Sequence, residues 1–427
     1  MRKILLFAFL LSLLIISCGK KSSGIELQDW NFGGRPRLIE WLRERVTLFE
    51  KTHPGIAVAQ SNKSWNMIRE ILFAEFSAGS GPDVVNTHAN YSSEFGEAGY
   101  YYPVNKFPDF KEVRQWYVPE LLESTRYKDN YYGLPSSAIA FVLVCNKELF
   151  DKEGIAPPKT WSQFREAAKR LTKDADHDGT VDQYGLILMG GDKGGFAYRT
   201  IPFFFKAGAD VMTDDLTKIV FNSPRGIAAL KLFVDMYQVD HSISPGFLAY
   251  THTEINDLFS NNKVAMSIEG PWFRGMVGDK NAGKDMYVVP VPVPDDRLDQ
   301  YDTAPTLQDI VMYSINARSK HLNEAWELLK FLRNEEADMA WIREDLGATA
   351  TTIKALNSPE AKNVKDLPVY INELKHARPW PSHPDMIAIA SNIFTPYCQK
   401  AIVGELSPKA ALDQAAKESQ DLIEGKK

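Results

Sequence analysis

The stretch IELQDW at residues 25–30, followed by IAVA at residues 56–59 and VV at residues 84–85, decides the fold of this chain. Glycine or proline precedes each of these short apolar runs, as is typical of buried strands. Between them, residues 36–49 and 65–76 carry apolar side chains at helical spacing. The order strand, helix, strand, helix, strand predicts parallel strands with helices outside, so the predicted fold class is α/β.

The N-terminus predicts export and a lipid anchor. Arg2 and Lys3 precede an apolar run that extends to Ile16. A charged start, a short apolar run and a small residue before the cut are typical of a secretory signal. The run is too short for a membrane-spanning helix, which needs about 20 residues. Cys18 directly follows Ser17, and this junction resembles the lipobox of bacterial lipoproteins.

This resemblance implies a signal peptide at residues 1–17 and a lipidated tether at residues 18–24, which is rich in Lys, Ser and Gly. The mature chain would lie outside the cytoplasm, in the periplasm or at the cell surface. The acyl chains on Cys18 would anchor it to the membrane. The alternative is an ordinary signal peptide that happens to contain a cysteine.

Composition is that of an ordinary globular protein. Hydrophobic residues make up 44% and charged residues 24% of the 427 residues, a length sufficient for two domains. The net charge is −6, and no basic run follows the tether, so nucleic acid is not an expected partner. Cys145 and Cys398 are expected to be two buried thiols rather than a disulfide, because a chain this long can build a core without cross-links.

Patterns further along the chain continue the α/β order. Residues 131–144 predict a turn and then one strand rich in β-branched and aromatic residues. Residues 160–171 predict a helix. Residues 264–268 and 310–315 predict further strands.

Five motifs in a fixed order carry a resemblance to a known family. They are Gly79-Ser80-Gly81-Pro82-Asp83, Asn146-Lys147-Glu148-Leu149-Phe150, Thr160-Trp161, Gly270-Pro271-Trp272 and Ile315-Asn316-Ala317. In this order they resemble the extracellular solute-binding proteins of ABC importers, in the sugar-binding branch that includes the maltose-binding proteins. The resemblance covers nearly the whole mature chain.

The resemblance implies a two-lobed periplasmic-binding-protein-like fold with a hinge between the lobes. The N-terminal lobe would take residues 25–138 and 305–342, and the C-terminal lobe residues 139–304 and 343–427. Such lobes close around a solute, and the closed form docks on a membrane permease. The implied partners are a carbohydrate, the transmembrane subunits of an ABC permease, and the membrane through the lipid anchor only, with the protein itself a monomer.

A carbohydrate has polar edges and C–H faces, so aromatic rings and amides are its natural partners. Strand ends of open α/β sheets border the crevice where ligands bind. Trp272 matches a family position that stacks on sugar, and Asn90 falls where the family has a sugar-binding polar residue. Core packing is the alternative role of each tryptophan. The predicted solute-binding residues are Trp30, Asn31, Trp65, Asn90, Trp272 and Trp380.

Residues 174–182 read DADHDGTVD, an acidic loop with a glycine for a sharp turn. Carboxylates at alternate positions favour a hard cation such as Ca²⁺. Gly185 stands where a full EF-hand has a bidentate Glu, so the loop departs from that motif, and an acidic surface turn is the alternative. The predicted ligands of this structural calcium are Asp174, Asp176, Asp178, Thr180 and Asp182.

The sequence has no motif typical of catalysis. It lacks His-Glu-x-x-His, Gly-x-Ser-x-Gly, Cys-x-x-Cys and a Walker loop. We therefore predict a binding protein with no catalytic cofactor. Two other functions stay open, which are the capture of a non-sugar solute (a phosphodiester, peptide or polyamine) by the same fold, and a surface enzyme that acts on polysaccharide.

Overall fold

The structure is a computed structural model that describes residues 24–34, 36–65, 68–281, 283–343 and 349–426. The predicted signal peptide and Cys18 lie outside these residues. Within the described part of the chain, no helix combines the length and the apolar character that crossing a membrane requires.

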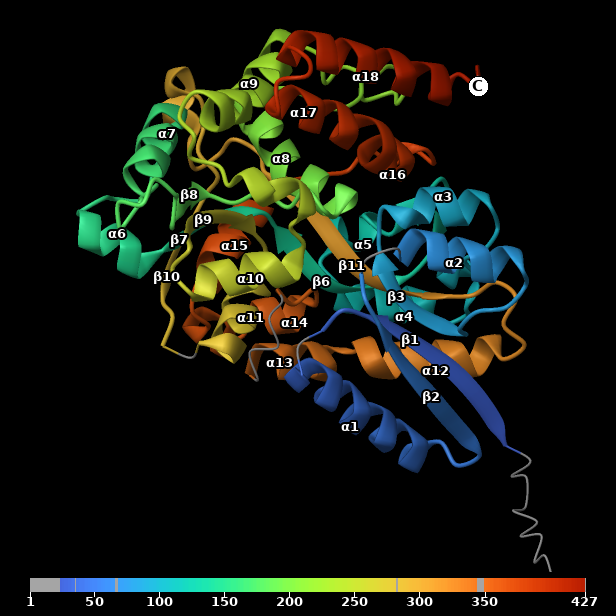
Figure 1. The fold of residues 1–427 in the computed structure, drawn as a ribbon. Coiled ribbons are helices and arrows are strands. Elements are labelled where there is room, and N and C mark those ends of the chain that lie inside the picture. Colours follow the sequence, from blue (N-terminus) through green and yellow to red (C-terminus); the bar gives the residue numbers. More distant parts are fainter. Residues whose placement is uncertain (1–23, 35, 66–67, 282, 344–348, 427) are drawn as a thin grey trace, which may run out of the picture.

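The first lobe is built on a six-stranded sheet (Figure 1). Its first strand pairs in parallel with the two strands that follow it in the chain, which confirms the predicted parallel start. A long later strand, β11, pairs antiparallel with β3 and β6 and parallel with the short β12. The strands are β1 (Ile25–Phe32), β2 (Ile56–Lys63), β3 (Val84–His88), β6 (Leu134–Ala140), β11 (Leu307–Ile315) and β12 (Arg378–Pro379).

Helices cover both faces of this sheet. Side chains alternate between faces along each strand, and apolar residues stand on both faces, so each face needs a covering layer. Leu27 and Val84 lie in the core on the side of α1 and α12, whereas Phe32 and Val85 lie in the core on the side of α2 and α3. The helices are α1 (Pro36–Thr52), α2 (Ile68–Ser77), α3 (Tyr91–Glu97) and α12 (Leu322–Arg333).

The second lobe is built on a four-stranded sheet in the order β10-β7-β9-β8. Helices α7, α8 and α9 pack on one face of it and α10 and α11 on the other. The strands are β7 (Val142–Asn146), β8 (Tyr184–Leu186), β9 (Val264–Glu269) and β10 (Met286–Val289). The helices are α7 (Trp161–Arg170), α8 (Lys193–Ala207), α9 (Pro224–Gln238), α10 (His252–Ser260) and α11 (Phe273–Lys280).

The remaining helices of the second half follow the long strand of the first sheet. In Figure 1, α17 and α18 lie beside α8 and α9, far from the strands of the first sheet. Their bounds are α13 (Glu335–Arg343), α14 (Ile353–Leu356), α15 (Leu367–Leu374), α16 (Met386–Ala388), α17 (Thr395–Ile402) and α18 (Pro408–Ile423).

The chain crosses between the two sheets at Phe141. The prediction of a single strand within residues 131–144 is wrong, because this stretch forms β6 in the first sheet and β7 in the second. A returning segment runs beside the crossing, where the Phe141 N–H donates to the carbonyl of Leu307 at 3.2 Å and the Thr306 hydroxyl donates to the carbonyl of Phe141 at 2.7 Å. Two segments thus cross side by side. The exact lobe boundaries stay a prediction, and β12, which we assigned to the C-terminal lobe, pairs with the first sheet.

Cys145 and Cys398 are both free and buried, as predicted. Burial raises the pKa of each thiol well above its ordinary value. Neither thiol is therefore a nucleophile at neutral pH.

Candidate functional site

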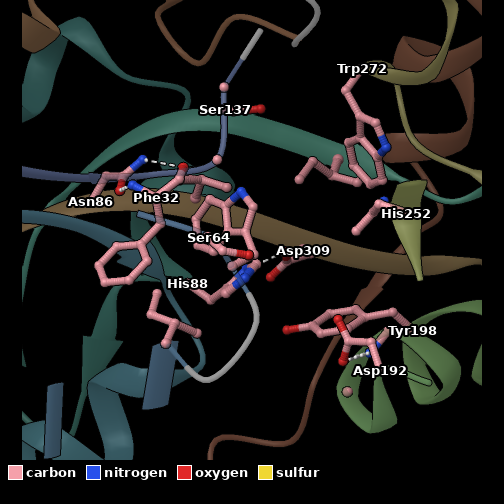
Figure 2. Close-up of a pocket in the computed structure, with 18 of the residues that line it drawn as sticks. Phe32, Ser64, Asn86, His88, Ser137, Asp192, Tyr198, His252, Trp272 and Asp309 are labelled. Carbon is pink, nitrogen blue, oxygen red and sulfur yellow. Dashed lines mark hydrogen bonds and ion pairs between the residues drawn. The ribbon is translucent and has the colours of Figure 1, made fainter. Parts of the chain in front are cut away.

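A cavity of about 390 Å³ lies between the two lobes and is lined from both of them (Figure 2). This volume falls within the range of small-molecule sites. Phe32, Asn86 and His88 contribute from strands of the first sheet, and Tyr198 and Trp272 from the helical side of the second lobe. In Figure 2 these two groups face each other across the open space.

Trp272 stands at the start of α11 and its ring points into the cavity (Figure 2). Its ring meets Phe141 edge-on, with centroids 5.8 Å apart. A Cβ atom on Gly270 would lie 2.1 Å from the Trp272 ring. Any residue other than glycine at position 270 would therefore clash with the ring in this position. The indole N–H is buried and has no hydrogen-bond partner among the described residues.

Trp65 lies on the opposite wall, where it packs against two other rings. Its ring centroid is 5.9 Å from that of Phe32 and 4.6 Å from that of His88. Gly33, at φ +65°, makes this possible, because a Cβ there would lie 1.9 Å from the Trp65 indole nitrogen. The Gly33-Gly34 pair therefore allows the tryptophan to approach the backbone closely.

Asn90 and Tyr198 join the two walls directly. The Asn90 amide N–H donates to the Tyr198 hydroxyl at 3.0 Å. The Tyr198 ring also meets His88, Phe141 and Trp380, with centroids 5.6, 5.6 and 5.4 Å away. Aromatic rings therefore run from Trp65 on one wall across to the other wall.

The Asn31 side chain lines the cavity, yet both ends of its amide are engaged. Its nitrogen donates to Asp29 at 2.8 Å, and its oxygen accepts from the Tyr313 hydroxyl at 2.5 Å. Burial raises the pKa of Asp29 to about 6, against the opposing hydrogen bonds from Gln60 and Asn31. These bonds fix the orientation of the Asn31 amide.

The charged groups around the cavity are mostly paired with one another. Arg199 makes two hydrogen bonds to Glu269, at 3.1 and 2.6 Å, and both side chains are buried. The His88 ring meets Asp309 at 2.7 Å (Figure 2). One oxygen of Asp192 accepts a hydrogen bond from the Gly195 N–H at 2.9 Å, and the other has no partner among the residues that the structure describes.

His252 lies beside Trp272 and forms no hydrogen bond within the described part of the chain. Burial lowers the pKa of its imidazole to about 3, and the charge of Arg199 adds to this effect. The ring is therefore neutral at physiological pH and offers one donor and one acceptor to a solute.

Several polar atoms of the cavity are buried without a partner in the described structure. They are the Asn90 side-chain oxygen and the indole nitrogens of Trp272, Trp341 and Trp380. A buried polar group without a hydrogen bond is costly, so these atoms call for a partner that a polar solute can supply.

The chain matches a family model over residues 35–339, and the description of that model is bacterial extracellular solute-binding protein. The chain belongs to this family. The prediction of a solute-binding protein with the two-lobed α/β fold is confirmed.

Relatives match nearly the full length. The chain is 26% identical to the galactooligosaccharide-binding protein of Bacillus subtilis over 97% of this chain and 95% of that protein. An ABC transporter solute-binding protein from Thermotoga lettingae, solved with bound alpha-D-tagatose, is 25% identical with a TM-score of 0.83, over 94% of this chain and 100% of that one. The maltotriose-bound MalE of Bdellovibrio bacteriovorus shares the fold, with 23% identity and a TM-score of 0.81 over 94% and 100%.

The structure brings five of the six predicted solute-binding residues of this solute-binding protein to the cavity. The exception is Trp30, which does not line it and instead packs under Lys63, whose ammonium lies 3.9 Å from the ring centroid. Trp30 points to the same face of the sheet as Phe32, but it lies two residues further from the carboxyl end of β1, where it packs against the core on the side of α2 and α3. The lining residues are Asn31, Trp65, Asn90, Trp272 and Trp380.

Sequence reasoning missed important lining residues, namely Asp192, Tyr198 and His252. A signal existed for part of this set. Gly190-Gly191-Asp192 before an apolar stretch is typical of a helix start, and so is Thr251 with Glu254 three residues later, which form a capping box. No pattern in the chain places Tyr198 against Asn90, because 108 residues separate them.

The predicted acidic loop gathers only part of its expected ligand set. Carboxylate oxygens of Asp174, Asp176 and Asp182 lie within 4.8 Å of one another. Asp178 lies outside this group, and one of its oxygens accepts a hydrogen bond from the Thr180 N–H at 2.7 Å. The structure therefore brings three of the four predicted carboxylates together, and the calcium site itself stays a prediction.

Proposed function

We propose that this solute-binding protein captures a carbohydrate, a di- or oligosaccharide, between its lobes and delivers it to the permease of an ABC importer. The observation that carries the proposal is the pairing of aromatic rings on both walls with unpartnered polar atoms between them. Rings cover the C–H faces of a sugar, while indole N–H groups and an amide oxygen bond its hydroxyls. The sugars named for the relatives agree with this chemistry.

A phosphodiester solute fits this cavity less well. A phosphate needs an unpaired cation, and Arg199 is engaged by Glu269. Of the basic residues that the sequence placed near the site, Arg35 lies outside the described residues, Lys63 covers Trp30 and Arg378 pairs with Asp210.

The test is a thermal-shift screen of mono-, di- and trisaccharides, followed by calorimetric titration. A true solute raises stability by about 2.7 kcal/mol at a hundred times its dissociation constant. A phosphodiester or peptide that binds where every sugar fails would overturn the carbohydrate assignment. Turnover of any bound oligosaccharide would contradict our proposal that the protein binds without catalysis.

We also propose that the protein is a monomer anchored through lipidated Cys18. The Ser17-Cys18 junction after a secretory signal supports the anchor. Cys18→Ala should leave an unprocessed or released chain in membrane fractionation. A variant that stays processed and membrane-bound would reject the anchor.

We further propose that the acidic loop holds a structural calcium ion. Three neighbouring carboxylates repel one another unless a cation joins them, and extracellular calcium is abundant enough for weak sites. Calcium should raise the melting temperature of the wild type and of Asp178→Ala, but not that of Asp176→Ala. Identical melting curves in calcium and in chelator would leave an acidic surface turn.

A further inference from the structure

Helix α8, 15 residues long, begins at the cavity, where Gly194 and Gly195 in its first turn are lining residues. The free N–H groups and the dipole at a helix N-terminus attract anions. An acidic solute would therefore find a favourable place here if nothing else filled it.

The chain fills this place with a carboxylate of its own. Asp192 is the N-cap of α8, and one of its oxygens accepts the hydrogen bond from Gly195. The other oxygen has no hydrogen-bond partner among the described residues, although Asp192 lines the cavity (Figure 2). The start of α10 is capped differently, by a capping box in which the Thr251 hydroxyl accepts from the Thr253 N–H and the Glu254 carboxylate accepts from the N–H of Thr251 at 2.7 Å.

The other charges at the cavity do not offset Asp192. Arg199 is bound by Glu269, and the His88 ring faces the carboxylate of Asp309. The buried oxygen of Asn90, a hydrogen-bond acceptor, also has no partner in the described structure. The free oxygen of Asp192 is therefore a negatively charged acceptor without a counter-charge among the described lining residues, which suits hydroxyl and ammonium groups and repels carboxylates.

We propose that Asp192 is a specificity-determining residue that makes the cavity select neutral and amino sugars against acidic sugars. The inference rests on the proposed function, since it concerns which carbohydrates the same cavity accepts. It assigns to Asp192 a role beyond helix capping, because the cap uses only one oxygen.

The test uses matched sugars that differ in charge. Calorimetry would compare glucose, glucosamine and glucuronate, and galactose, galactosamine and galacturonate, each as the monosaccharide and as the trisaccharide. The wild type should bind the neutral member at least about thirtyfold more tightly than the uronate. Asp192→Asn should shrink this ratio about tenfold and weaken the amino sugar relative to the neutral one.

Asparagine caps helices as well as aspartate does, so Asp192→Asn should fold, and Asp192→Ser provides a second capping variant. Asp214→Asn, which removes an exposed carboxylate of the same lobe that does not line the cavity, should leave the ratio unchanged.

Two failures are distinguishable. A neutral sugar that binds no more tightly than its uronate, or an unchanged ratio in Asp192→Asn, would overturn the inference and leave the carbohydrate function standing. Failure of every sugar, in both series and in the thermal-shift screen, would overturn the proposed function together with the inference.

Discussion

The two walls of the cavity differ in how their polar groups are used. On one wall, here called the strand wall, the polar side chains form hydrogen bonds within the protein. This wall is formed by Asn31, Asn86, His88, Asp309 and Tyr313. Asn31 bonds Tyr313, His88 meets Asp309, and Asn86 accepts from the Phe32 N–H at 2.5 Å. The helix wall, formed by Asp192, Tyr198, His252 and Trp272, leaves an indole N–H, an imidazole and a carboxylate oxygen without partners in the described structure.

This difference indicates that the two walls have different roles, one in the shape of the cavity and the other in the binding of the solute. A satisfied network holds its side chains rigidly, so the strand wall gives the cavity a fixed shape. Unpartnered groups gain most when a polar solute arrives, so the helix wall should carry more of the binding free energy. Substitutions on the strand wall should therefore reduce the stability of the fold, and substitutions on the helix wall should reduce affinity.

The largest expected effect is on the helix wall. Trp272→Ala removes an aromatic ring that points into the cavity and a buried indole N–H that has no partner among the described residues. It should weaken binding of a sugar by at least about 2 kcal/mol, or about thirtyfold, by analogy with central aromatic residues of interfaces. Calorimetric titration of the folded variant with a sugar identified by the screen measures this loss.

Trp30→Ala is the matched control, because this tryptophan came from the same sequence reasoning but lies outside the cavity. Its affinity should stay within about twofold of the wild type. Equal affinities for wild type and Trp272→Ala would show that Trp272 contributes nothing to sugar binding, and the helix wall would lose its largest proposed contributor.

The next effect is on the strand wall and on stability. Asn31→Ala leaves the buried Tyr313 hydroxyl without its acceptor and removes a donor from Asp29. The free energy of unfolding should fall by about 2 kcal/mol. Urea unfolding measures it, and Asn62→Ala, at the exposed position paired with Asn31 on β2, should change stability little. A large affinity loss with unchanged stability would show that Asn31 belongs with the helix wall in function.

Acid should act on the helix wall through His252. The pKa of its imidazole falls from 6.5 to about 3 on folding, mainly through burial. The neutral ring therefore contributes stability that is complete above pH 6.5 and is lost progressively as the pH falls towards 3. Each pH unit within this window costs about 1.4 kcal/mol. Unfolding curves at pH 6 and 5 should show this extra loss in the wild type and its absence in His252→Gln, and parallel losses would contradict it.

The strand wall was largely predictable from sequence, and the helix wall was predictable only in part. Parallel strands with glycine-bounded ends place Asn31 and the start of the Asn90 turn at one sheet edge. Trp272 was recognisable because it follows Gly270-Pro271 at the end of a strand. Trp30 was misplaced because the sequence does not show how far along the strand the cavity extends: Phe32, on the same face of the sheet, lines the cavity, and Trp30, two residues earlier, does not.

Tyr198, His252 and Asp192 escaped prediction for a different reason. Their local patterns predict helix starts and apolar faces, which every helix of an α/β protein shares. Their chemistry arises from partners distant in the chain, such as the Arg199–Glu269 pair, whose members are 70 residues apart. A single sequence carries no signal for such pairings.

The smallest expected effect lies where the two walls touch. The Asn90–Tyr198 hydrogen bond joins the first lobe to the second, so it should favour the closed arrangement in which a solute is held. A hydrogen bond between neutral groups contributes about 1 kcal/mol, which is roughly fivefold in affinity.

Because each residue also lines the cavity, single substitutions mix this bond with direct contacts to the sugar. A double-mutant cycle of Tyr198→Phe with Asn90→Ala separates them and should give a coupling of about that size in sugar affinity. The same cycle with Ser137→Ala, a lining residue without a bond to Tyr198, should give a coupling near zero. If the Asn90 cycle were also additive, the two walls would act independently, and closure of the lobes would depend on the sugar alone.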